Sequence, residues 1–354
     1  NLCMEYEFSV VAEAEVEADK LRSLVNEFNG KSVVVLGDLM LDHYVYTEPR
    51  KLSREAPVIV ADYSSESYRP GGAGNLASIL TRMGARVSLV GAVGLDDDAD
   101  KLLVELKANG VDISGVITTN RRTCVKRRIY VGRRQYLRID SEDRTPLEGS
   151  SADQLLTMFS KGLQGADLAL ISDHDKGTLT PTLIYRVVEL AKEAGKCVVS
   201  RPKVEHLFDY AHVDSVVATV REASEAVGVR ILNDSSLRNL GFNMLTRMES
   251  GSVYLHDQHM SYLFEPNSVT YVPSLVKPTY QEAIGVRDII TAAYGLAYAA
   301  SKSGLYASLI SRAAESLYVE ATNGARTQLG IAHLEESISR FFGDGYSYRT
   351  VKVR

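Results

Sequence analysis

Short apolar runs alternate along the chain with segments of helical spacing. Residues 32–38, SVVVLGD, are rich in β-branched side chains and predict a buried strand that ends at Gly37 and Asp38. Residues 74–84 have apolar side chains three and four positions apart and predict a helix that ends at Gly84. Further strands are expected at 87–94, 167–172, 196–200, 213–219 and 250–256, and further helices at 98–110, 183–195, 288–302 and 307–322. This alternation is typical of βαβ units and predicts an α/β fold with a mostly parallel sheet covered on both faces.

Two segments interrupt the alternation. Residues 43–63 and 123–140 alternate with period two and have no helix between their halves, so they predict antiparallel strands outside the main sheet. We expect them to form a small β flap at the carboxyl edge of the sheet, where ligands bind in open α/β folds. With no repeat or low-complexity linker, the chain predicts one domain over 31–340. A helical extension is expected at 1–30 and a C-terminal tail at 341–354.

Composition narrows the class of protein. Hydrophobic residues make up 45% and charged residues 24%, as in ordinary globular domains, and the net charge of -5 argues against a nucleic-acid-binding surface over the whole molecule. Cys3, Cys124 and Cys197 form no disulfide framework or zinc cluster. No apolar run approaches the roughly 20 residues of a membrane span, and the acidic N-terminus is unlike a targeting peptide. We therefore expect a cytoplasmic protein without nucleic-acid or membrane partners.

Small and polar residues surround two predicted strand ends. RPGGAGNLA, residues 69–77, places Gly71 and Gly72 before a helix and Asn75 in its first turn, where an amide can bond to ligand hydroxyls. GDLMLD, residues 37–42, places Asp38 and Asp42 after the first strand, where a carboxylate can accept bonds from sugar hydroxyls. Taken alone, each motif is more often a turn or a helix cap.

The predicted flap contains a basic cluster. Lys126, Arg127 and Arg128 are consecutive, and Arg133, Arg134 and Arg138 follow. Such side chains could hold a phosphorylated substrate, or they could protect a solvated edge strand against aggregation. SDHDKG, residues 172–177, ends another strand with acidic residues and a lysine. A metal role for His174 is disfavoured because no second histidine stands at ligand spacing.

A polar turn begins the most apolar helix. In AIGVRD, residues 283–288, Gly285 leads into Asp288 at the predicted helix N-terminus, where proteins hold anions. Val286 and Arg287 stand where close backbone approach to phosphate would favour glycine. The turn therefore fits three alternatives: a working phosphoryl-transfer site, a site rebuilt with other residues, or the remnant of a site that has lost its activity.

Together these motifs resemble the ribokinase-like (PfkB) sugar kinases, and within them the heptose-7-phosphate kinases of lipopolysaccharide precursor synthesis. The resemblance extends from about residue 31 to 335 and rests on the motifs above with SREAPV, LVGAVGLDDDA, TCVKRRI and LRIDSE. It implies a three-layer α/β/α sandwich with a β flap that acts as a lid. It also implies a homodimer that forms through the flaps.

The resemblance assigns roles residue by residue. It implies that Asp288 is the catalytic base in a turn with Gly285 and Arg287. For the acceptor sugar it implies the residues Asp38, Gly71, Gly72, Asn75, Asp173 and, for a phosphate on the sugar, Lys126 and Arg128. For ATP it implies Lys203, Thr219, Glu222, His259 and Arg312, with Glu222 acting indirectly on Mg²⁺.

The nucleotide half departs from the family pattern. Val286 replaces the second glycine of the GAGD turn, and Ile284 replaces the threonine before it. Of the family's Asn-x-x-Glu motif only Glu222 is present, and Arg201 replaces the aspartate of the family's Asp-Pro-Lys segment. Tyr254, His259 and Arg312 replace a threonine, a glycine and an asparagine. Either the arginines Arg201, Arg287 and Arg312 take over the stabilisation of the nucleotide, or ATP binding has been abandoned.

Two functional hypotheses follow. The first is an ATP-dependent kinase of a phosphorylated, heptose-like sugar, in which Asp288 activates the attacking hydroxyl. The alternative is a catalytically inactive relative that binds a sugar phosphate or serves as an assembly protein. A dehydrogenase is disfavoured because the first strand is not followed by a GxGxxG loop.

Overall fold

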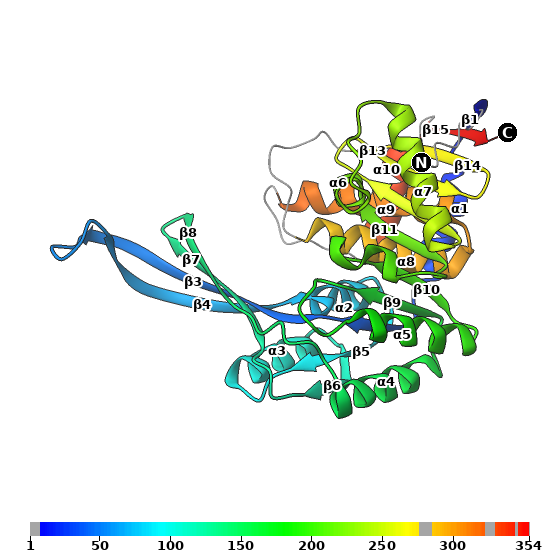
Figure 1. The fold of residues 1–354 in the computed structure, drawn as a ribbon. Coiled ribbons are helices and arrows are strands. Elements are labelled where there is room, and N and C mark those ends of the chain that lie inside the picture. The colour runs from blue at the N-terminus through cyan, green and yellow to red at the C-terminus, as the bar shows by residue number, and fades with distance from the viewer. Residues whose placement is uncertain (1–7, 276–284, 323–329, 344–345, 354) are drawn as a thin grey trace.

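The computed structural model describes residues 8–275, 285–322, 330–343 and 346–353. Its body is one 11-stranded sheet between two layers of helices, and a four-stranded sheet extends from this body as a long arm (Figure 1). The strands of the main sheet are β1 (Phe8–Glu15), β2 (Ser32–Gly37), β5 (Arg86–Val93), β6 (Asp112–Thr118), β9 (Leu168–Ser172), β10 (Cys197–Arg201), β11 (Ser215–Thr219), β12 (Ser252–His256), β13 (Met260–Glu265), β14 (Ser268–Pro273) and β15 (Ser347–Val353).

The strand order places several carboxyl ends side by side. The order is β1-β15-β14-β13-β12-β11-β10-β9-β2-β5-β6. Every pair from β12 to β6 is parallel, whereas the pairs from β12 to β1 are antiparallel. The ends of β2, β9, β10, β11 and β12 therefore meet at one edge, which is the usual ligand-binding edge of an α/β sheet.

Two apolar cores, one on each face, hold the layers together. Val33 and Val35 of β2 face one core and Val34 and Leu36 the other, as the two-residue period of a strand requires. The first core is covered by α1 (Ala18–Asn26), α2 (Ala73–Arg82), α3 (Asp97–Ala108), α8 (Val286–Ser301), α9 (Gly304–Thr322) and α10 (Ile331–Phe342). The second is covered by α4 (Gly149–Leu163), α5 (Pro181–Glu193), the 3₁₀ helix η1 (Val204–Asp209), α6 (Val220–Val227) and α7 (Asp234–Met248). The predicted α/β class is confirmed.

Both ends of the described chain differ from the prediction. The expected helical extension contains the strand β1 before the helix α1, and the expected tail contains the strand β15. These two strands pair with each other in antiparallel register, and β15 also pairs with β14. The prediction was wrong here because a strand at a chain end depends on a distant partner, which local periodicity does not reveal.

The arm is the predicted flap, with one correction to its pairing. It consists of β3 (Leu39–Leu52), β4 (Ile59–Gly72), β7 (Cys124–Val131) and β8 (Arg134–Ser141), in the order β4-β3-β7-β8. Each segment folds into an antiparallel pair as expected, but the two segments meet through a parallel pairing of β3 with β7. Because β3 follows β2 directly and β4 leads directly into α2, the base of the flap lies at the carboxyl edge of the main sheet.

Within the part of the chain that the structure describes, no helix combines the length and apolar character needed to cross a bilayer.

Candidate active site

Asp288 lies at the start of α8, next to a strand end and to α2. It occupies the first helical turn, and only 8% of its surface is exposed. Its carboxylate accepts a hydrogen bond from Asn75 Nδ2 at 2.6 Å and forms an ion pair with Arg201 Nη1 at 2.5 Å. Residues from α2, β10 and α8 therefore converge on this carboxylate.

The turn before Asp288 depends on one glycine. Gly285 caps α8 with φ +90°, a left-handed conformation that side chains disfavour. A Cβ there would also lie 3.0 Å from Tyr318 Oη and 3.4 Å from Asn75 Nδ2. Val286 is already the first helical residue, two positions before the predicted start of this helix at 288. Gly285 thus lets the helix N-terminus approach Asn75 closely.

The Gly71–Gly72 turn ends the flap and begins α2. A Cβ on Gly71 would lie 2.7 Å from Asp42 Oδ2, and one on Gly72 would lie 2.5 Å from the carbonyl oxygen of Asp38. Gly72 also has φ +58° and stands against His174, whose Cδ2 would be 3.5 Å from such a Cβ. These close contacts explain both glycines, and they place the loop after β9 beside the first turn of α2.

Asp38 organises the loop that follows β9. It has no exposed surface, and its carboxylate accepts backbone N–H bonds from His174 at 2.8 Å, Lys176 at 3.2 Å and Thr178 at 3.1 Å. Burial, followed by the neighbouring charge of Asp173, raises the pKa of Asp38. The structure thus gives Asp38 a role in holding residues 173–178, and direct bonding to a sugar stays a prediction.

Asp173 and Arg128 are also engaged by protein groups. Asp173 accepts bonds from the backbone N–H of Asp175 at 2.8 Å and from Tyr210 Oη at 2.9 Å, and it pairs with His206 Nδ1 at 2.8 Å. The guanidinium of Arg128 pairs with Asp42 at 2.5 Å and lies 5.3 Å from the ring centre of Tyr44. Neither side chain lines the cavity described next, and their predicted contacts with the sugar stay untested.

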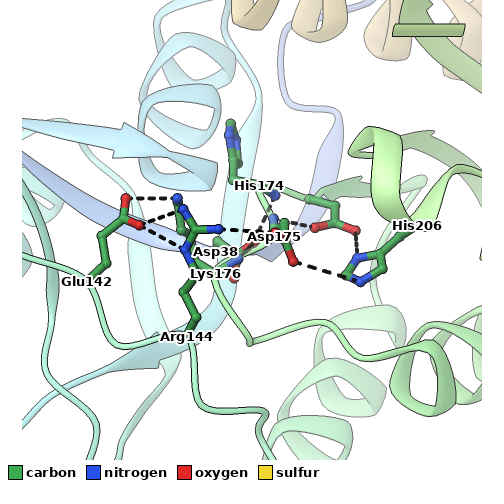
Figure 2. A network of polar contacts seen from close by, with 8 residues as sticks. Asp38, Glu142, Arg144, His174, Asp175, Lys176 and His206 are labelled. Carbon is green, nitrogen blue, oxygen red and sulfur yellow. Dashed lines mark hydrogen bonds and ion pairs between the residues drawn. The ribbon is translucent and has the colours of Figure 1, made fainter. Parts of the chain in front are cut away.

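A small cavity of about 280 Å³ lies between the flap base and the 173–178 loop. It is lined by Met40, Lys126, Arg144, His174, Asp175, Lys176, Lys203 and Glu205. Figure 2 shows part of this region, with Glu142 and Arg144 on one side of Lys176 and His206 with Asp175 on the other. Lys126 was predicted for the acceptor side, whereas Lys203 was predicted for the nucleotide side. The structure brings these two lysines to the same cavity.

Thr219 and Glu222 form a helix cap at the end of β11. Thr219 Oγ1 accepts the N–H of Glu222, and Glu222 Oε2 accepts the N–H of Thr219, which is a capping box at the start of α6. The other oxygen of Glu222 pairs with Arg287 Nη1 at 2.8 Å. Burial favours protonation of Glu222, but Arg287 and the Thr219 N–H outweigh it and lower the pKa of this carboxyl.

Arg312 is enclosed within the body. It has no exposed surface, and its guanidinium pairs with Glu315 at 2.5 Å and donates to Ser261 Oγ at 3.1 Å and to the carbonyl of Asp257 at 3.0 Å. His259, in contrast, is exposed in the turn between β12 and β13. The residues predicted for the nucleotide therefore do not form one cluster. The guanidinium of Arg312 bonds to protein groups inside the body, and Lys203 lines the cavity.

The fit of a magnesium ion can be tested on these contacts. Mg²⁺ requires oxygen ligands, usually one or two carboxylates together with substrate phosphates. The carboxylates of Glu222 and Asp288 are each paired with an arginine, and among the described residues no three His, Cys, Asp or Glu side chains gather as a metal site. The described residues therefore do not fit a protein-bound magnesium site, and we derive no step through it.

Sequence analysis did not identify all the residues of this site. Arg201 was expected only as a possible stabiliser of the nucleotide and not as the partner of Asp288, and no role was predicted for Lys176 or His206. Arg201 and Lys176 stand at or just after the carboxyl ends of β10 and β9. Their position was a usable signal, because strand ends on this edge point toward the site. His206 lies in the 3₁₀ helix, for which the sequence carries no comparable pattern.

Comparisons with known proteins agree on one family. The model of the pfkB family carbohydrate kinases matches residues 30–325. The bifunctional protein HldE of Geobacter metallireducens is 32% identical over 287 residues, which cover 80% of this chain and 58% of that protein. HldE of Caulobacter vibrioides is 32% identical over 306 residues, with coverages of 85% and 62%. The chain thus spans about three fifths of the length of these relatives.

Solved structures of low sequence identity have the same fold. Phosphofructokinase-2 from Escherichia coli, in complex with fructose-6-phosphate, matches with a TM-score of 0.70 at 15% identity and covers 89% of this chain and 98% of its own. Arabidopsis thaliana ribokinase, complexed with ribose and ATP, matches with a TM-score of 0.65 at 19% identity, with coverages of 88% and 99%. These matches confirm the ribokinase-like architecture.

Proposed function

Since this chain belongs to the pfkB family of carbohydrate kinases, we propose that it transfers the γ-phosphoryl group of ATP to a hydroxyl of a phosphorylated sugar similar to heptose 7-phosphate. The main support is the position of Asp288. Its carboxylate lies in the first turn of α8 and accepts a hydrogen bond from Asn75, which stands in the first turn of α2 just after Gly71 and Gly72. A carboxylate in this place can accept the proton of an attacking hydroxyl.

The surrounding groups suit a reaction that depends on position and charge. Phosphoryl transfer needs alignment of the attacking oxygen and stabilisation of charge on the transferred group. Asn75 would fix the orientation of the Asp288 carboxylate, and the N-terminus of α8 would direct its partial positive charge at the phosphoryl oxygens. Arg201 and Arg287 would supply full positive charges in the same region.

Both arginines are paired with carboxylates in the described state. For transfer to occur, Arg287 would exchange Glu222 for a phosphate oxygen, and Arg201 would shift part of its interaction from Asp288 to the phosphoryl group. Such an exchange replaces one charge-assisted bond by another, so its net cost is small if the phosphate is well placed. The proposal therefore requires that nucleotide binding loosens two ion pairs.

Calorimetry and a turnover assay test this proposal together. Titration with ATP and Mg²⁺ is expected to release heat and to raise the melting temperature, since a ligand of the native state stabilises it. Heptose 7-phosphate with ATP is expected to yield ADP at a rate that depends on protein concentration. The absence of both nucleotide binding and ADP formation would overturn the kinase proposal.

A second candidate is a catalytically inactive relative that binds a sugar phosphate or takes part in an assembly. It is favoured by the pairs Arg201–Asp288 and Arg287–Glu222, which neutralise the charges that a nucleotide would need. Heat from a sugar phosphate without any heat from ATP would support this candidate.

The flap supports a proposal about assembly. Its strands expose large apolar side chains, among them Tyr63 of β4 and Tyr136, Leu137 and Ile139 of β8. Exposed apolar strands need cover, and we propose a homodimer in which two flaps pack together. Light scattering after gel filtration is expected to give twice the chain mass, and Leu137→Glu is expected to give a monomer. A monomeric unmodified chain at micromolar concentration would contradict this.

A further inference from the structure

We propose that His256, the last residue of β12, is a further residue of the phosphoryl-donor site. Its imidazole ring bonds to a phosphate group of the donor other than the one that is transferred, and it takes up a proton from solvent when that phosphate binds. This inference rests on the proposed function for the identity of the donor.

The ring of His256 is an unpaired polar group inside the protein. Only 4% of the residue is exposed, and within the described part of the chain its ring makes no hydrogen bond. A buried polar group without a bond is costly and is uncommon in folded proteins. Because β12 ends at the carboxyl edge of the parallel part of the sheet, a ligand bound at that edge can supply the missing bond.

Arg312 holds the backbone on one side of His256. Its guanidinium donates to the carbonyl of the next residue, Asp257, at 3.0 Å and to Ser261 Oγ at 3.1 Å. Ser261 is the residue that stands opposite His256 on the neighbouring strand β13. Arg312 therefore fixes the end of β12 and brings a full positive charge close to the ring.

A helix N-terminus lies on the other side of His256. Thr219, which stands opposite His256 on β11, is the cap of α6. The start of α6 therefore directs its partial positive charge at the same edge of the sheet. Glu222, in the first turn of α6, pairs with Arg287 Nη1 at 2.8 Å, so the first turn of α8 is held next to this place. Two helix N-termini and an unbonded imidazole thus surround one position, which suits an anion.

The strand order places His256 at a distance from the proposed base. Arg201, the last residue of β10, pairs with Asp288, and β11 lies between β10 and β12. Neighbouring strands are about 4.8 Å apart, so the backbones of His256 and Arg201 are separated by on the order of 10 Å. The transferred phosphate must lie beside the carboxylate of Asp288. A phosphate that reaches His256 is therefore a more distant member of the same phosphate chain.

The charges around the ring determine its protonation. Desolvation, followed by the charges of Arg312, Arg287 and Arg201, lowers the pKa of His256 well below its usual value. The titratable groups on the elements packed around it are Arg201, Glu222, Tyr254, Asp257, Arg287, Asp288, Arg312 and Glu315. Without ligand the ring is neutral near pH 7 and can donate one hydrogen bond. A bound phosphate opposes the guanidinium charges and favours the protonated ring, so binding takes up a proton.

Calorimetric titrations of the full chain test this inference. The probes are ATP with Mg²⁺, tripolyphosphate with Mg²⁺, and adenosine, each titrated in buffers of different ionisation enthalpy so that the number of protons taken up is measured. We expect both phosphate probes to bind with proton uptake, and adenosine to cause none. Because the complex holds a proton that the free protein lacks, the affinity for both phosphate probes should fall several-fold from about pH 6 to about pH 8.

Two variants separate hydrogen bonding from titration. His256→Gln keeps a donor but cannot titrate, so it should retain most of the affinity for ATP and lose the proton uptake and the pH dependence. His256→Ala should weaken ATP binding by about tenfold or more, and should raise the KM for ATP while leaving that for heptose 7-phosphate unchanged. His212→Gln is the control, since His212 lies between η1 and β11 and pairs with Glu249. It should change none of these quantities.

Several results would overturn the role of His256. These are unchanged or tighter ATP binding in His256→Ala, equal proton uptake by the unmodified chain and His256→Gln, or no binding of either phosphate probe. Tighter binding would mean that the ring obstructs the nucleotide. If the melting temperature shows that His256→Ala does not fold, the proton uptake of His256→Gln decides. Binding of tripolyphosphate with proton uptake, but no ATP binding and no ADP formation, would contradict the kinase proposal alone.

Discussion

The two halves of the site hold their positive charges differently. Around the cavity at the flap base, Lys126 and Lys203 have no carboxylate partner among the described residues. Around the first turn of α8, Arg201 and Arg287 are paired with Asp288 and Glu222. A phosphate that enters the cavity meets cations without partners, whereas one that enters the transfer region must compete with carboxylates of the protein. The positive charges of the cavity therefore favour the binding of an anionic ligand, whereas the positive charges near Asp288 stabilise carboxylates of the protein.

The largest expected effect concerns Asp288, the proposed base. Asp288→Asn removes the proposed proton acceptor but keeps a side chain of the same shape. Turnover should fall by about 10²–10⁴-fold, the usual contribution of a general base, while heptose 7-phosphate binding should change little. Steady-state ADP formation measures the turnover, and calorimetry measures the binding of heptose 7-phosphate. Asp153→Asn, at an exposed position on α4, is the control, and full activity in Asp288→Asn would remove this residue from the mechanism.

The enclosed pair on α9 should matter mainly for stability. Arg312→Met leaves Glu315 buried without its cation, which should cost about 3–5 kcal/mol in the free energy of unfolding. The double change Arg312→Met with Glu315→Met should recover part of this loss because no charge remains buried. Urea denaturation measures both. If Arg312→Met instead leaves stability unchanged and reduces ATP affinity, Arg312 contacts the nucleotide as the family resemblance implies.

The Glu222→Gln variant tests whether the ion pair between Arg287 and Glu222 limits nucleotide binding. Glutamine keeps the capping contacts with Thr219 but removes the charge that holds Arg287. ATP should then bind a few-fold more tightly, and Arg287→Ala should abolish this gain together with turnover. Weaker ATP binding in Glu222→Gln would show that the carboxylate acts with the metal ion of the nucleotide.

The smallest expected effect is a pH dependence near the cavity. The hydrogen bond to Asp173 raises the pKa of His206 above its ordinary value of 6.5. The protonated ring therefore contributes stability that is fully present below about pH 6.5 and is lost as pH rises through the higher folded-state pKa. Melting temperatures should fall over that range and fall less in His206→Gln. Identical pH profiles would show that His206 does not titrate there.

Much of the fold was predictable from local patterns. The strands that are buried on both faces, such as β2 and β9, are short apolar runs, and the helices between them have clear apolar spacing. The pairing of β1 with β15 and the parallel contact of β3 with β7 were not predictable, because each joins segments far apart in the sequence. Periodicity determines which side chains are buried and carries no information about the partner strand.

The site was predictable where the backbone itself is constrained. Gly285 and the Gly71–Gly72 turn were predicted from their glycines, and the structure shows that their conformations or close contacts exclude a Cβ. The charge partners were harder to predict, because the sequence did not identify Arg201 as the partner of Asp288. Side chains from different strands meet according to the topology, so their pairing becomes visible only when the sheet order is known. The position of Lys203 in the lining of the cavity was not predictable for the same reason.

The pairing of β1 with β15 also has a consequence for synthesis of the protein on the ribosome. The chain emerges with β1 among its first described residues, but the strand that pairs with β1 is the last described element. Bringing such distant segments together has a high loop-closure entropy and is slow compared with the formation of local contacts. β1 must therefore remain without its partner while the rest of the sheet folds, and during that time its unpaired edge is accessible to chaperones.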